Sequence, residues 1–454
     1  MLELTSCQQK ACEIIAHGEN VFITGPAGTG KSFLLDHVRS NIFKTQRKTY
    51  TVTATTGIAA VLITGQTLHS ALGVGILDRP VEYYVKRLTS TYRRPAAALA
   101  WECDVLIIDE ISMLSDESFD KLDRIGRAVR KTPNRPFGGI QLVLCGDFFQ
   151  LPPVEGELAF RSNSWDECIG NNTVVLEHNM RQKAGSRFEQ ILREIRQGGV
   201  TSEVREFLRE RQDASIPDDG ILPTELHTTN TRADKVNNDH YAKLISEGVK
   251  EKMYARTSVL VDAEFKEVYQ LALDKTLLPE TLRLATGAQV MLLVNLDVKN
   301  DLVNGSRGIV IGFDASGIPI VRFCRGTGRT SLQIPVTAHT SETSHSIGNR
   351  EESILFSITQ IPLRLAYAIT IHKSQGLTMD RVLVDLHRVF AAGQVYVAMS
   401  RAKSAEGLFI RNVSEKDIFA DKAVISFYNH MSEERPVRSP VPVRMVPDLV
   451  EFVT

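Results

Sequence analysis

The stretch VFITGPAGTGKS, residues 21–32, decides the fold of this chain. Its first four residues are β-prone and predict a short buried strand, and the apolar spacing of SFLLDHVRSN, which begins at Ser32, predicts a helix. The glycines between them therefore lie in a turn that joins a strand to a helix. Residues 25–32 match the pattern G-x-x-x-x-G-K-S, whose backbone N–H groups surround phosphate oxygens. The stretch predicts a nucleotide-phosphate site on an α/β sheet.

Each residue type in this loop has a physical role. Glycines let the backbone approach a phosphate closely, and the N-terminus of the following helix adds its positive dipole end. The residues expected to line the phosphates are Gly25, Gly28, Thr29 and Gly30. We expect Lys31 to contact the β- and γ-phosphates of ATP and the Ser32 hydroxyl to bind Mg²⁺. The alternative is a glycine-rich turn with a solvated lysine.

Length and composition set limits on the rest of the chain. At 454 residues it is too long for one ordinary core, and 43% hydrophobic with 24% charged residues is typical of a globular protein. The formal net charge of −1 gives no bulk basic field, so any nucleic-acid binding needs a local groove. The six cysteines show no metal-ligand spacing and are expected to be reduced, as in an intracellular compartment. No apolar run predicts a membrane span.

Strand-like and helix-like runs alternate through two parts of the chain. This rhythm predicts an α/β fold with parallel sheets, in a first domain over 1–180 and a second over 181–302 and 361–430. The strand candidates of the first domain are VFIT, TYTVTATT, DVLIID, IQLVLCGD and TVVLEH. Short strands with turn residues between them, GIVIGF, IPIVRF and TSLQIP, predict a small β-barrel inserted at 303–360. A proline-rich tail, 431–454, is expected to be extended.

A basic, tyrosine-bearing segment interrupts the first domain at about 73–100. Its sequence includes DRPVEYYVKRLTSTYRRP. It is either a contact element, such as a wedge that splits a duplex, or an ordinary solvated surface segment.

Two carboxylates follow the strand VLII. Asp109 and Glu110 stand where ligands bind in such sheets, at the carboxyl ends of the strands. In combination with the phosphate loop, Asp109 is expected to bind Mg²⁺ and Glu110 to orient or deprotonate the attacking water. A helix cap is the alternative for an isolated acidic pair.

A third strand, IQLVLCGD, leads to Gln150 at the same edge. Its amide is expected to contact the γ-phosphate, and the alternative is a turn glutamine packed against Pro152 and Pro153. Phosphoryl transfer also needs positive charge near the transferred group, commonly an arginine from a neighbouring domain. Arg181 in LEHNMRQ and Arg401 in VYVAMSRAKS are the candidates, although an arbitrary arginine is usually a solvated surface residue.

Together these segments resemble the Pif-type (petite integration frequency) DNA helicases, superfamily one enzymes that move 5′ to 3′ on single strands. The resemblance extends from residue 4 to about 430, with the motifs in the family's order. The stretches that carry it include LTSCQ, TATTGIAAVLITGQTLHSALGVG, FDKLDRIGRAVRKTPNRPFGGIQLVLCGDFFQLPPV, LVNGSRGIV, AYAITIHKSQGLTMDRV and GQVYVAMSRAKS.

The resemblance implies roles for further residues. It implies that Gln8 reads the adenine base and that Arg181 and Arg401 are arginine fingers. Gln375 and Gly376 match the motif that couples ATP to the DNA track. The positions that match strand contacts are Thr55, His69, His372 and Lys373.

By this resemblance, the fold is two RecA-like P-loop NTPase domains with an inserted SH3-like β-barrel, which either clamps the strand or is a structural insertion. The implied activity is ATP-dependent 5′-to-3′ unwinding of DNA, with ATP and Mg²⁺ as cofactors and single-stranded DNA and DNA forks as partners. We expect no membrane partner, a monomer when free and a dimer on DNA, and a nuclear or other DNA-containing compartment. Two alternatives stay open: an NTP-dependent switch or translocase that does not separate strands, and the ATPase subunit of a nuclease.

Overall fold

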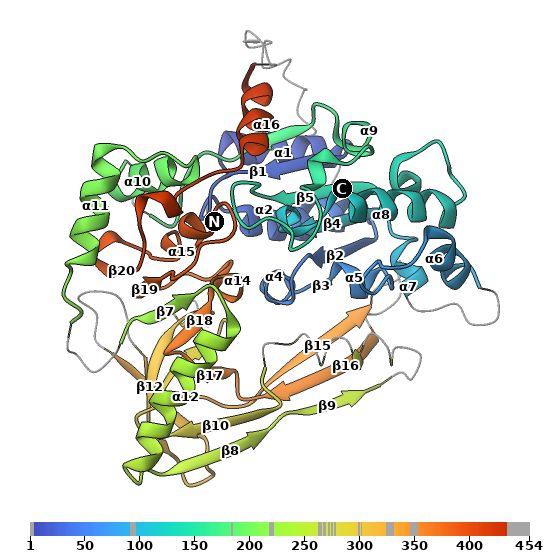
Figure 1. Ribbon diagram of the computed structural model, residues 1–454. Coiled ribbons are helices and arrows are strands. Elements are labelled where there is room, and N and C mark those ends of the chain that lie inside the picture. The colour runs from blue at the N-terminus through green and yellow to red at the C-terminus, as the bar shows by residue number, and fades with distance from the viewer. Residues whose placement is uncertain are drawn as a thin grey trace, which may run out of the picture.

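A six-stranded parallel sheet forms the centre of the N-terminal unit in the computed structural model (Figure 1). The structure describes residues 4–433 except 91–96, 183–184, 218–221, 262–265, 267–268, 271–272, 274–275, 277, 298–299, 301, 324–330 and 346–352. The strand order is β3-β2-β4-β5-β1-β6. The strands are β1 (Val21–Thr24), β2 (Tyr50–Ala54), β3 (Gln66–Thr67), β4 (Val105–Asp109), β5 (Gln141–Gly146) and β6 (Thr173–Val175). All five expected strands are confirmed, and the two-residue β3 was not predicted.

Helices cover this sheet, whose strands β1, β4 and β5 are buried along their whole length. Such continuous burial is typical of parallel strands with both faces covered. The helices of this unit are α1 (Ser6–Ala16), α2 (Lys31–His37), the π-helix η1 (Val38–Phe43), α3 (Lys44–Gln46), α4 (Gly57–Leu62), α5 (Leu68–Ala71), α6 (Val81–Leu88), α7 (Ala97–Ala100), α8 (Asp116–Val129) and α9 (Trp165–Ile169). Short 3₁₀ turns lie at η2 (Ile111–Met113), η3 (Pro136–Gly139) and η4 (Ala159–Arg161).

A second parallel sheet, of four strands in the order β18-β7-β19-β20, forms the C-terminal unit. Its strands are β7 (Thr224–His227), β18 (Ala368–Thr370), β19 (Val382–Asp385) and β20 (Leu408–Arg411). Its helices and turns are α10 (Arg187–Arg196), α11 (Ser202–Gln212), α12 (Asn230–Ser246), α14 (Ile371–Ser374), α15 (Gln394–Met399), η7 (Ala405–Gly407) and η8 (Glu415–Asp417). The structure therefore contains the two parallel α/β units that the sequence predicts.

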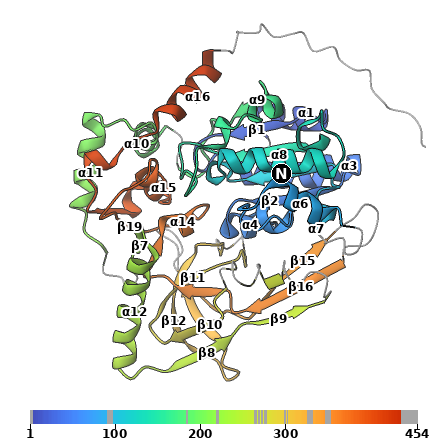
Figure 2. The same ribbon diagram turned by 45° about the vertical axis from the view of Figure 1, so that its right-hand side comes forward.

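Antiparallel strands lie in the chain between α12 and β18, and they are below both parallel units in Figures 1 and 2. They form a five-stranded sheet (β14-β13-β12-β11-β17), a three-stranded sheet (β15-β16-β9) and a two-stranded sheet (β10-β8). Their bounds are β8 (Glu251–Ala255), β9 (Thr257–Leu260), β10 (Thr281–Ala285), β11 (Gln289–Leu292), β12 (Arg307–Phe313), β13 (Pro319–Phe323), β14 (Leu332–Pro335), β15 (His339–His345), β16 (Ser353–Gln360) and β17 (Leu363–Leu365).

The antiparallel region begins earlier than the expected boundary at residue 303. Strand β9 pairs with β16, and β11 pairs with both β12 and β17, so β9 and β11 belong with the inserted strands and not with the second parallel sheet. The sequence pattern missed this because the pairing partners lie far away in the chain, so local alternation gave no sign of them.

The basic segment at 73–100 is partly built into the first unit. Helix α6 buries Val81, Tyr84 and Leu88 in the same hydrophobic cluster as Trp101 and the sheet residue Phe22. Its described part is therefore a packed helix and not a fully solvated loop, although Tyr83 remains half-exposed. Residues 91–96 of this segment lie outside the described residues.

The last described helix, α16 (Lys422–Glu433), returns to the first unit, at the top of Figure 1. Phe427 stacks on Phe160 with ring centroids 4.2 Å apart, and the Tyr428 hydroxyl lies 2.6 Å from Thr24 Oγ1 at the end of β1. Residues 422–430 were expected within the second domain, but they belong to α16, which packs on the first. Except for the last residues of α16, the expected tail at 431–454 lies outside the described residues.

A buried ion pair joins the two parallel units. Asp147, directly after β5, accepts hydrogen bonds from Arg196 Nε at 3.0 Å and Arg196 Nη2 at 2.7 Å, and Arg196 is the last residue of α10. The Arg196 guanidinium also lies 4.3 Å from the centre of the Phe149 ring. The Asp147 side chain is fully buried and that of Arg196 is 9% exposed, so neither charge is stabilised by bulk water.

None of the helices among the described residues is long and apolar enough to cross a membrane. The described cysteines, Cys7, Cys12, Cys103, Cys145 and Cys168, are free thiols, and Cys324 lies outside the described residues.

We predict that Arg196→Met strongly destabilises the fold, because it leaves the Asp147 carboxylate buried without a partner. Breaking a buried pair in this way costs about 3–5 kcal/mol. The matched control is Arg205→Met, which removes an exposed ion pair to Glu415 and should cost less than about 1 kcal/mol. The midpoint of thermal unfolding distinguishes them, and equal midpoints for the two variants would contradict the prediction.

Candidate active site

The three sequence elements expected to bind the nucleotide lie side by side. Strands β4, β5 and β1 are neighbours in the sheet, with Ile108 paired to Leu144 and Gly146 paired to Thr24. The phosphate loop follows β1, the carboxylates stand at the end of β4, and the turn that carries Gln150 follows β5. Because the strands are parallel, their carboxyl ends bring these three elements to one edge.

The phosphate loop has a backbone conformation that favours glycine. Gly28 has φ +87° and Gly30, the N-cap of α2, has φ +81°. A Cβ atom at Gly28 would lie 2.6 Å from the Cβ of Arg181, closer than two side chains can approach. The Lys31 ammonium donates to the Gly25 carbonyl at 2.7 Å and to the Pro26 carbonyl at 3.0 Å. The loop thus holds its own lysine over the turn.

A cavity of about 400 Å³ lies between the loop and the second parallel unit. The predicted residues that line it are Gly28, Thr29, Gly30, Lys31, Ser32, Glu110, Gln150, Arg181, Gly376 and Arg401. Four other predicted residues lie next to this lining: Gly25 through its bond to Lys31, Gln8 against Gly30, Asp109 beside Glu110, and Gln375 through a bond to Glu110. The structure therefore brings together, in one place, residues from both units.

The two carboxylates lie close to each other, with Asp109 buried and Glu110 partly buried. Glu110 has a left-handed backbone with φ 54°, and its N–H donates to Asp109 Oδ1 at 2.9 Å. Burial and the neighbouring Glu110 raise the pKa of Asp109 to about 7, against the opposing effect of Lys31. Burial also raises the pKa of Glu110, while Lys31 and Arg401 act to lower it. A cation bound here would relieve this repulsion, which fits Asp109 and Ser32 as Mg²⁺ ligands.

Glu110 takes part in one of the contacts between the two units. Gln375, directly after α14 in the second unit, donates from Nε2 to Glu110 Oε2 at 2.9 Å. Thr55, after β2, donates from Oγ1 to the Glu110 carbonyl at 2.7 Å. The Glu110 carboxylate therefore contacts the motif expected to couple ATP to DNA, and its backbone carbonyl contacts a residue expected to touch the strand.

Two arginines lie on the far side of the cavity. Arg401 is fully buried, and its guanidinium donates to the Val397 carbonyl at 2.9 Å and to Ser400 Oγ at 2.8 Å. Arg181 donates to the Ser400 carbonyl at 3.0 Å. Burial and the neighbouring Arg181 lower the pKa of Arg401 to about 9, and burial lowers the pKa of Arg181. A polyanion in the cavity would stabilise both cations.

Gln8 has an unused donor that faces the loop. Thr5 and Gln8 form a capping box at the start of α1, in which Gln8 Oε1 accepts from the Thr5 N–H at 3.0 Å. Gln8 is 1% exposed, and its Nε2 has no hydrogen-bond partner among the described residues. A Cβ at Gly30 would lie 3.1 Å from this nitrogen. A buried donor beside the phosphate loop fits the base of a bound nucleotide.

The predicted strand-contacting residues do not line the cavity. Thr55 follows β2, His69 lies on α5, and His372 and Lys373 lie on α14, next to Gln375. Burial lowers the pKa of His372. Burial and the neighbouring Arg364 lower the pKa of Lys373, so two cations lie close to each other on this part of the second unit.

Sequence reasoning missed several residues of the site. Met180, Thr378 and Lys403 line the cavity, and the Tyr396 hydroxyl accepts from the Ala27 N–H of the phosphate loop at 2.9 Å. Tyr396 and Lys403 both lie in the segment VYVAMSRAKS that drew attention to Arg401, so their sequence neighbourhood was the available signal. Met180 and Thr378 carry no chemical signature in sequence.

Comparison with known proteins agrees with this geometry. Residues 3–206 match the family model of PIF1-like helicase, and residues 271–313 match that of the DNA helicase Pif1 2B domain. The ATP-dependent DNA helicase PIF1 of Danio rerio is 39% identical over 95% of this chain. The chain spans 65% of the length of that relative.

Solved structures of Pif1 helicases are also similar to this chain. The Pif1 helicase from Candida albicans is 36% identical with a TM-score of 0.73, and the match covers 95% of this chain and 100% of that one. Pif1 from Bacteroides sp, solved in complex with ADP-AlF4, is 30% identical with a TM-score of 0.78, over 96% of this chain and 98% of that one. With its two parallel α/β units, its phosphate loop and its paired arginines, the chain belongs to the PIF1-like helicase family.

Proposed function

We propose that this chain is an ATP-dependent DNA helicase that moves 5′ to 3′ along single-stranded DNA. The observation that carries the proposal is the composition of the cavity. Lys31, Glu110 and Gln150 come from one parallel unit, Arg401 from the other and Arg181 from their junction, all around one space. A passive binding module has no need for a buried carboxylate and two arginines at its phosphate site.

In this proposal the residues divide the work of hydrolysis. The loop N–H groups and Lys31 bind the phosphates, and Glu110 orients the attacking water and accepts its proton. Gln150 contacts the γ-phosphate, while Arg181 and Arg401 stabilise the charge that develops on the transferred group. Mg²⁺, bound by Ser32 and Asp109, would neutralise phosphate charge in this site.

Opening and closing of the cavity would drive the movement of the protein along single-stranded DNA. ATP bridges the units because both contribute cations to its phosphates, and hydrolysis removes that shared ligand. Gln375 responds directly to the loss of the γ-phosphate, because it donates to Glu110. Gln375 caps the C-terminus of α14, the helix that carries His372 and Lys373. A change at the γ-phosphate can therefore reach the expected DNA contacts within one helical turn.

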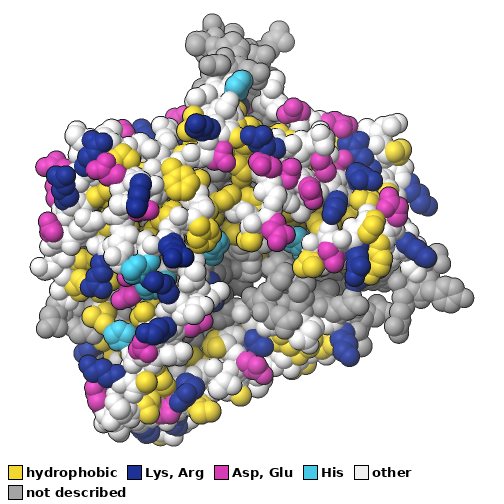
Figure 3. Space-filling view, viewed as in Figure 1, with side chains coloured by type: hydrophobic (Ala, Val, Ile, Leu, Met, Phe, Trp, Pro, Cys, Tyr) yellow, Lys and Arg dark blue, Asp and Glu magenta, His cyan; other side chains and the backbone are white. Residues whose placement is uncertain are grey.

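The DNA track is proposed to run past α14 and the loop after β2. Lys373 and Arg364 are like charges near Asp234, and a DNA phosphate would relieve their repulsion. Elsewhere the surface mixes Lys and Arg with Asp and Glu, as Figure 3 shows for one face. A narrow track of this kind needs few cations, which agrees with the net charge of −1.

The partners are proposed by analogy with relatives. A solved structure shows Bacteroides Pif1 bound to ssDNA, and another describes unwinding at forked dsDNA by two coordinating Pif1 helicases. We therefore propose single-stranded DNA and forks as substrates, a free monomer and a pair on the fork, in a DNA-containing compartment. The segment at 73–100 is the proposed wedge, and the antiparallel sheets are the proposed clamp.

The direct test is strand separation on two partial duplexes, one with a 5′ tail and one with a 3′ tail. ATP-dependent unwinding is expected from the 5′ tail alone, and Lys31→Ala should abolish it because the phosphates lose their cation. Unwinding from the 3′ tail would contradict the proposed polarity. DNA-stimulated hydrolysis without strand separation would favour the alternative, a translocase or switch.

Arg401→Ala should lower the rate of ATP hydrolysis by about 10³-fold or more, because an arginine finger acts mainly on the transition state. ATP affinity should change far less. Single-turnover hydrolysis and equilibrium nucleotide binding measure the two effects separately. The control is Arg193→Ala, which alters an exposed arginine on α10 paired with Glu189. Unchanged turnover in Arg401→Ala would remove this residue from the mechanism.

Gln8→Ala should weaken discrimination between ATP and GTP by about tenfold or more, because the side-chain amide that can accept from N6 and donate to N7 of adenine is lost. The measurement is the ratio of kcat/KM for the two nucleotides. Gln9→Ala is the matched control, since the neighbouring Gln9 side chain is exposed and bonds only to the Leu4 carbonyl among the described contacts. Equal ratios in the two variants would show that Gln8 does not read the base.

A further inference from the structure

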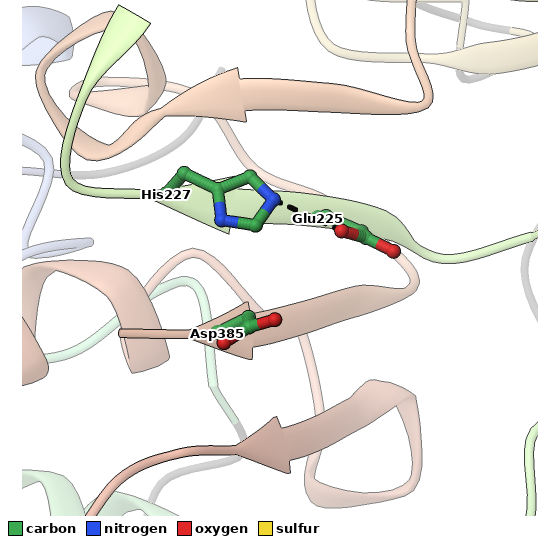
Figure 4. A group of neighbouring side chains, drawn as sticks. All are labelled: Glu225, His227 and Asp385. Carbon is green, nitrogen blue, oxygen red and sulfur yellow. Dashed lines mark hydrogen bonds and ion pairs between the residues drawn. The ribbon is translucent and has the colours of Figure 1, made fainter. Parts of the chain in front are cut away.

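A second group of chemistry-bearing side chains lies in the C-terminal unit, away from the nucleotide cavity. Glu225 and His227 are on β7 and Asp385 is the last residue of β19 (Figure 4). One ligand atom from each of the three lies within 4.8 Å of those from the other two. None of these residues takes part in the ATP chemistry proposed above.

Strand geometry explains why they meet. Glu225 and His227 are two residues apart on one strand, so their side chains point to the same face of the sheet. Strand β7 pairs in parallel with β19 in a register that joins Glu225 to Leu383 and Leu226 to Val384. Leu226 and Val384 face the hydrophobic core of this unit. Asp385 and the two residues of β7 therefore share the opposite face, at the carboxyl edge of the sheet.

The imidazole of His227 is oriented and has one nitrogen without a partner. Its Nε2 lies 2.9 Å from Glu225 Oε2. An ionised carboxylate only accepts hydrogen bonds, so Nε2 carries the proton and Nδ1 presents its lone pair in the neutral ring. His227 is 3% exposed, and Nδ1 has no hydrogen-bond partner among the described residues. In Figure 4 this nitrogen is on the side of the ring that faces Asp385.

Asp385 is held from its other side. Asn412, directly after β20, donates from Nδ2 to Asp385 Oδ1 at 2.7 Å and lies 3.4 Å from Nε2 of His387. This leaves Asp385 Oδ2 for another partner, and it brings the exposed His387 to the same place. A buried imidazole nitrogen without a partner among the described residues, on the side of the ring that faces a carboxylate, has the geometry of a cation ligand.

We propose that His227 Nδ1 and Asp385 bind a divalent transition-metal cation, with His387 within reach as a further ligand. Glu225 is a positioning residue that orients the imidazole through Nε2, an arrangement common in protein zinc sites. Imidazole and carboxylate ligands together suit Zn²⁺, whereas Mg²⁺ prefers oxygen ligands alone. The cation would link the end of β7 to the end of β19. Strand β19 leads into α15 and on to Arg401, so the metal stabilises the unit that supplies this arginine.

The test uses the full chain, stripped of metal with a chelator, without nucleotide or DNA. Isothermal titration with Zn²⁺ should show one saturable site that a large excess of Mg²⁺ does not block. His227→Gln should weaken this binding at least tenfold. His430→Gln, an exposed histidine on α16, is the control and should leave the binding unchanged. Zn²⁺ should also raise the midpoint of thermal unfolding in the wild-type chain and not in His227→Gln.

Further variants test the metal site if the first variant does not fold. If His227→Gln does not fold by circular dichroism, Asp385→Asn serves instead and should weaken Zn²⁺ binding at least tenfold. With Co²⁺ as a probe, Glu225→Gln should bind more weakly and change the visible absorption spectrum, which a merely structural role would not do. Absence of a saturable site in the wild-type chain would overturn the proposal. So would Zn²⁺ binding that is equal in wild type, His227→Gln and Asp385→Asn, because the ion would then be held elsewhere.

Discussion

The buried ion pair between Asp147 and Arg196 is the constraint on which the active site depends. Asp147 also accepts from the Phe149 N–H at 3.2 Å, and its carbonyl accepts from the Gln150 N–H at 2.9 Å. The same carboxylate therefore shapes the turn that presents Gln150 and anchors that turn to α10 of the other unit. Since neither charge reaches water, the pair is stable only while both partners stay in place.

Helix α16 completes this anchor from the far end of the chain. Tyr428 stacks on Phe149 with ring centroids 4.9 Å apart, and its hydroxyl accepts from the Phe148 N–H at 3.2 Å. The Arg196 guanidinium, which bonds to the Asp147 carboxylate, lies over the Phe149 ring and 5.5 Å from the Tyr428 ring centre. The last helix thus covers the ion pair and excludes water from it. If the two parallel units rotate relative to each other, the axis of rotation should pass close to this ion pair.

The sequence predicted which residues meet at the cavity, but it did not predict the long-range contacts that join the two parallel units. A glycine-rich turn after an apolar strand, and carboxylates after another, follow from local pattern, and parallel strands bring such ends together without further information. The return of α16, the Asp147–Arg196 pair and the early start of the antiparallel strands depend on contacts between residues far apart in the chain. Local periodicity has no access to these. Gln8 and Gln375 came from family resemblance, because an isolated glutamine has no chemical signature.

In the proposed helicase, coupling between ATP and DNA depends on the environment of one carboxylate, that of Glu110. Glu110 is partly buried, its side chain accepts from Gln375, and its backbone carbonyl accepts from Thr55. Lys31 and Arg401 favour its charged form, and burial opposes it. When phosphates occupy the cavity, they compete for the same two cations, and when the γ-phosphate leaves, that competition weakens. The strength of the Gln375 bond must change with these charges, because a carboxylate accepts a stronger hydrogen bond when it is ionised. Gln375 and Thr55 lie on different units and both bond to Glu110, so in the proposed helicase a change of charge at Glu110 would act directly on the contact between the two units.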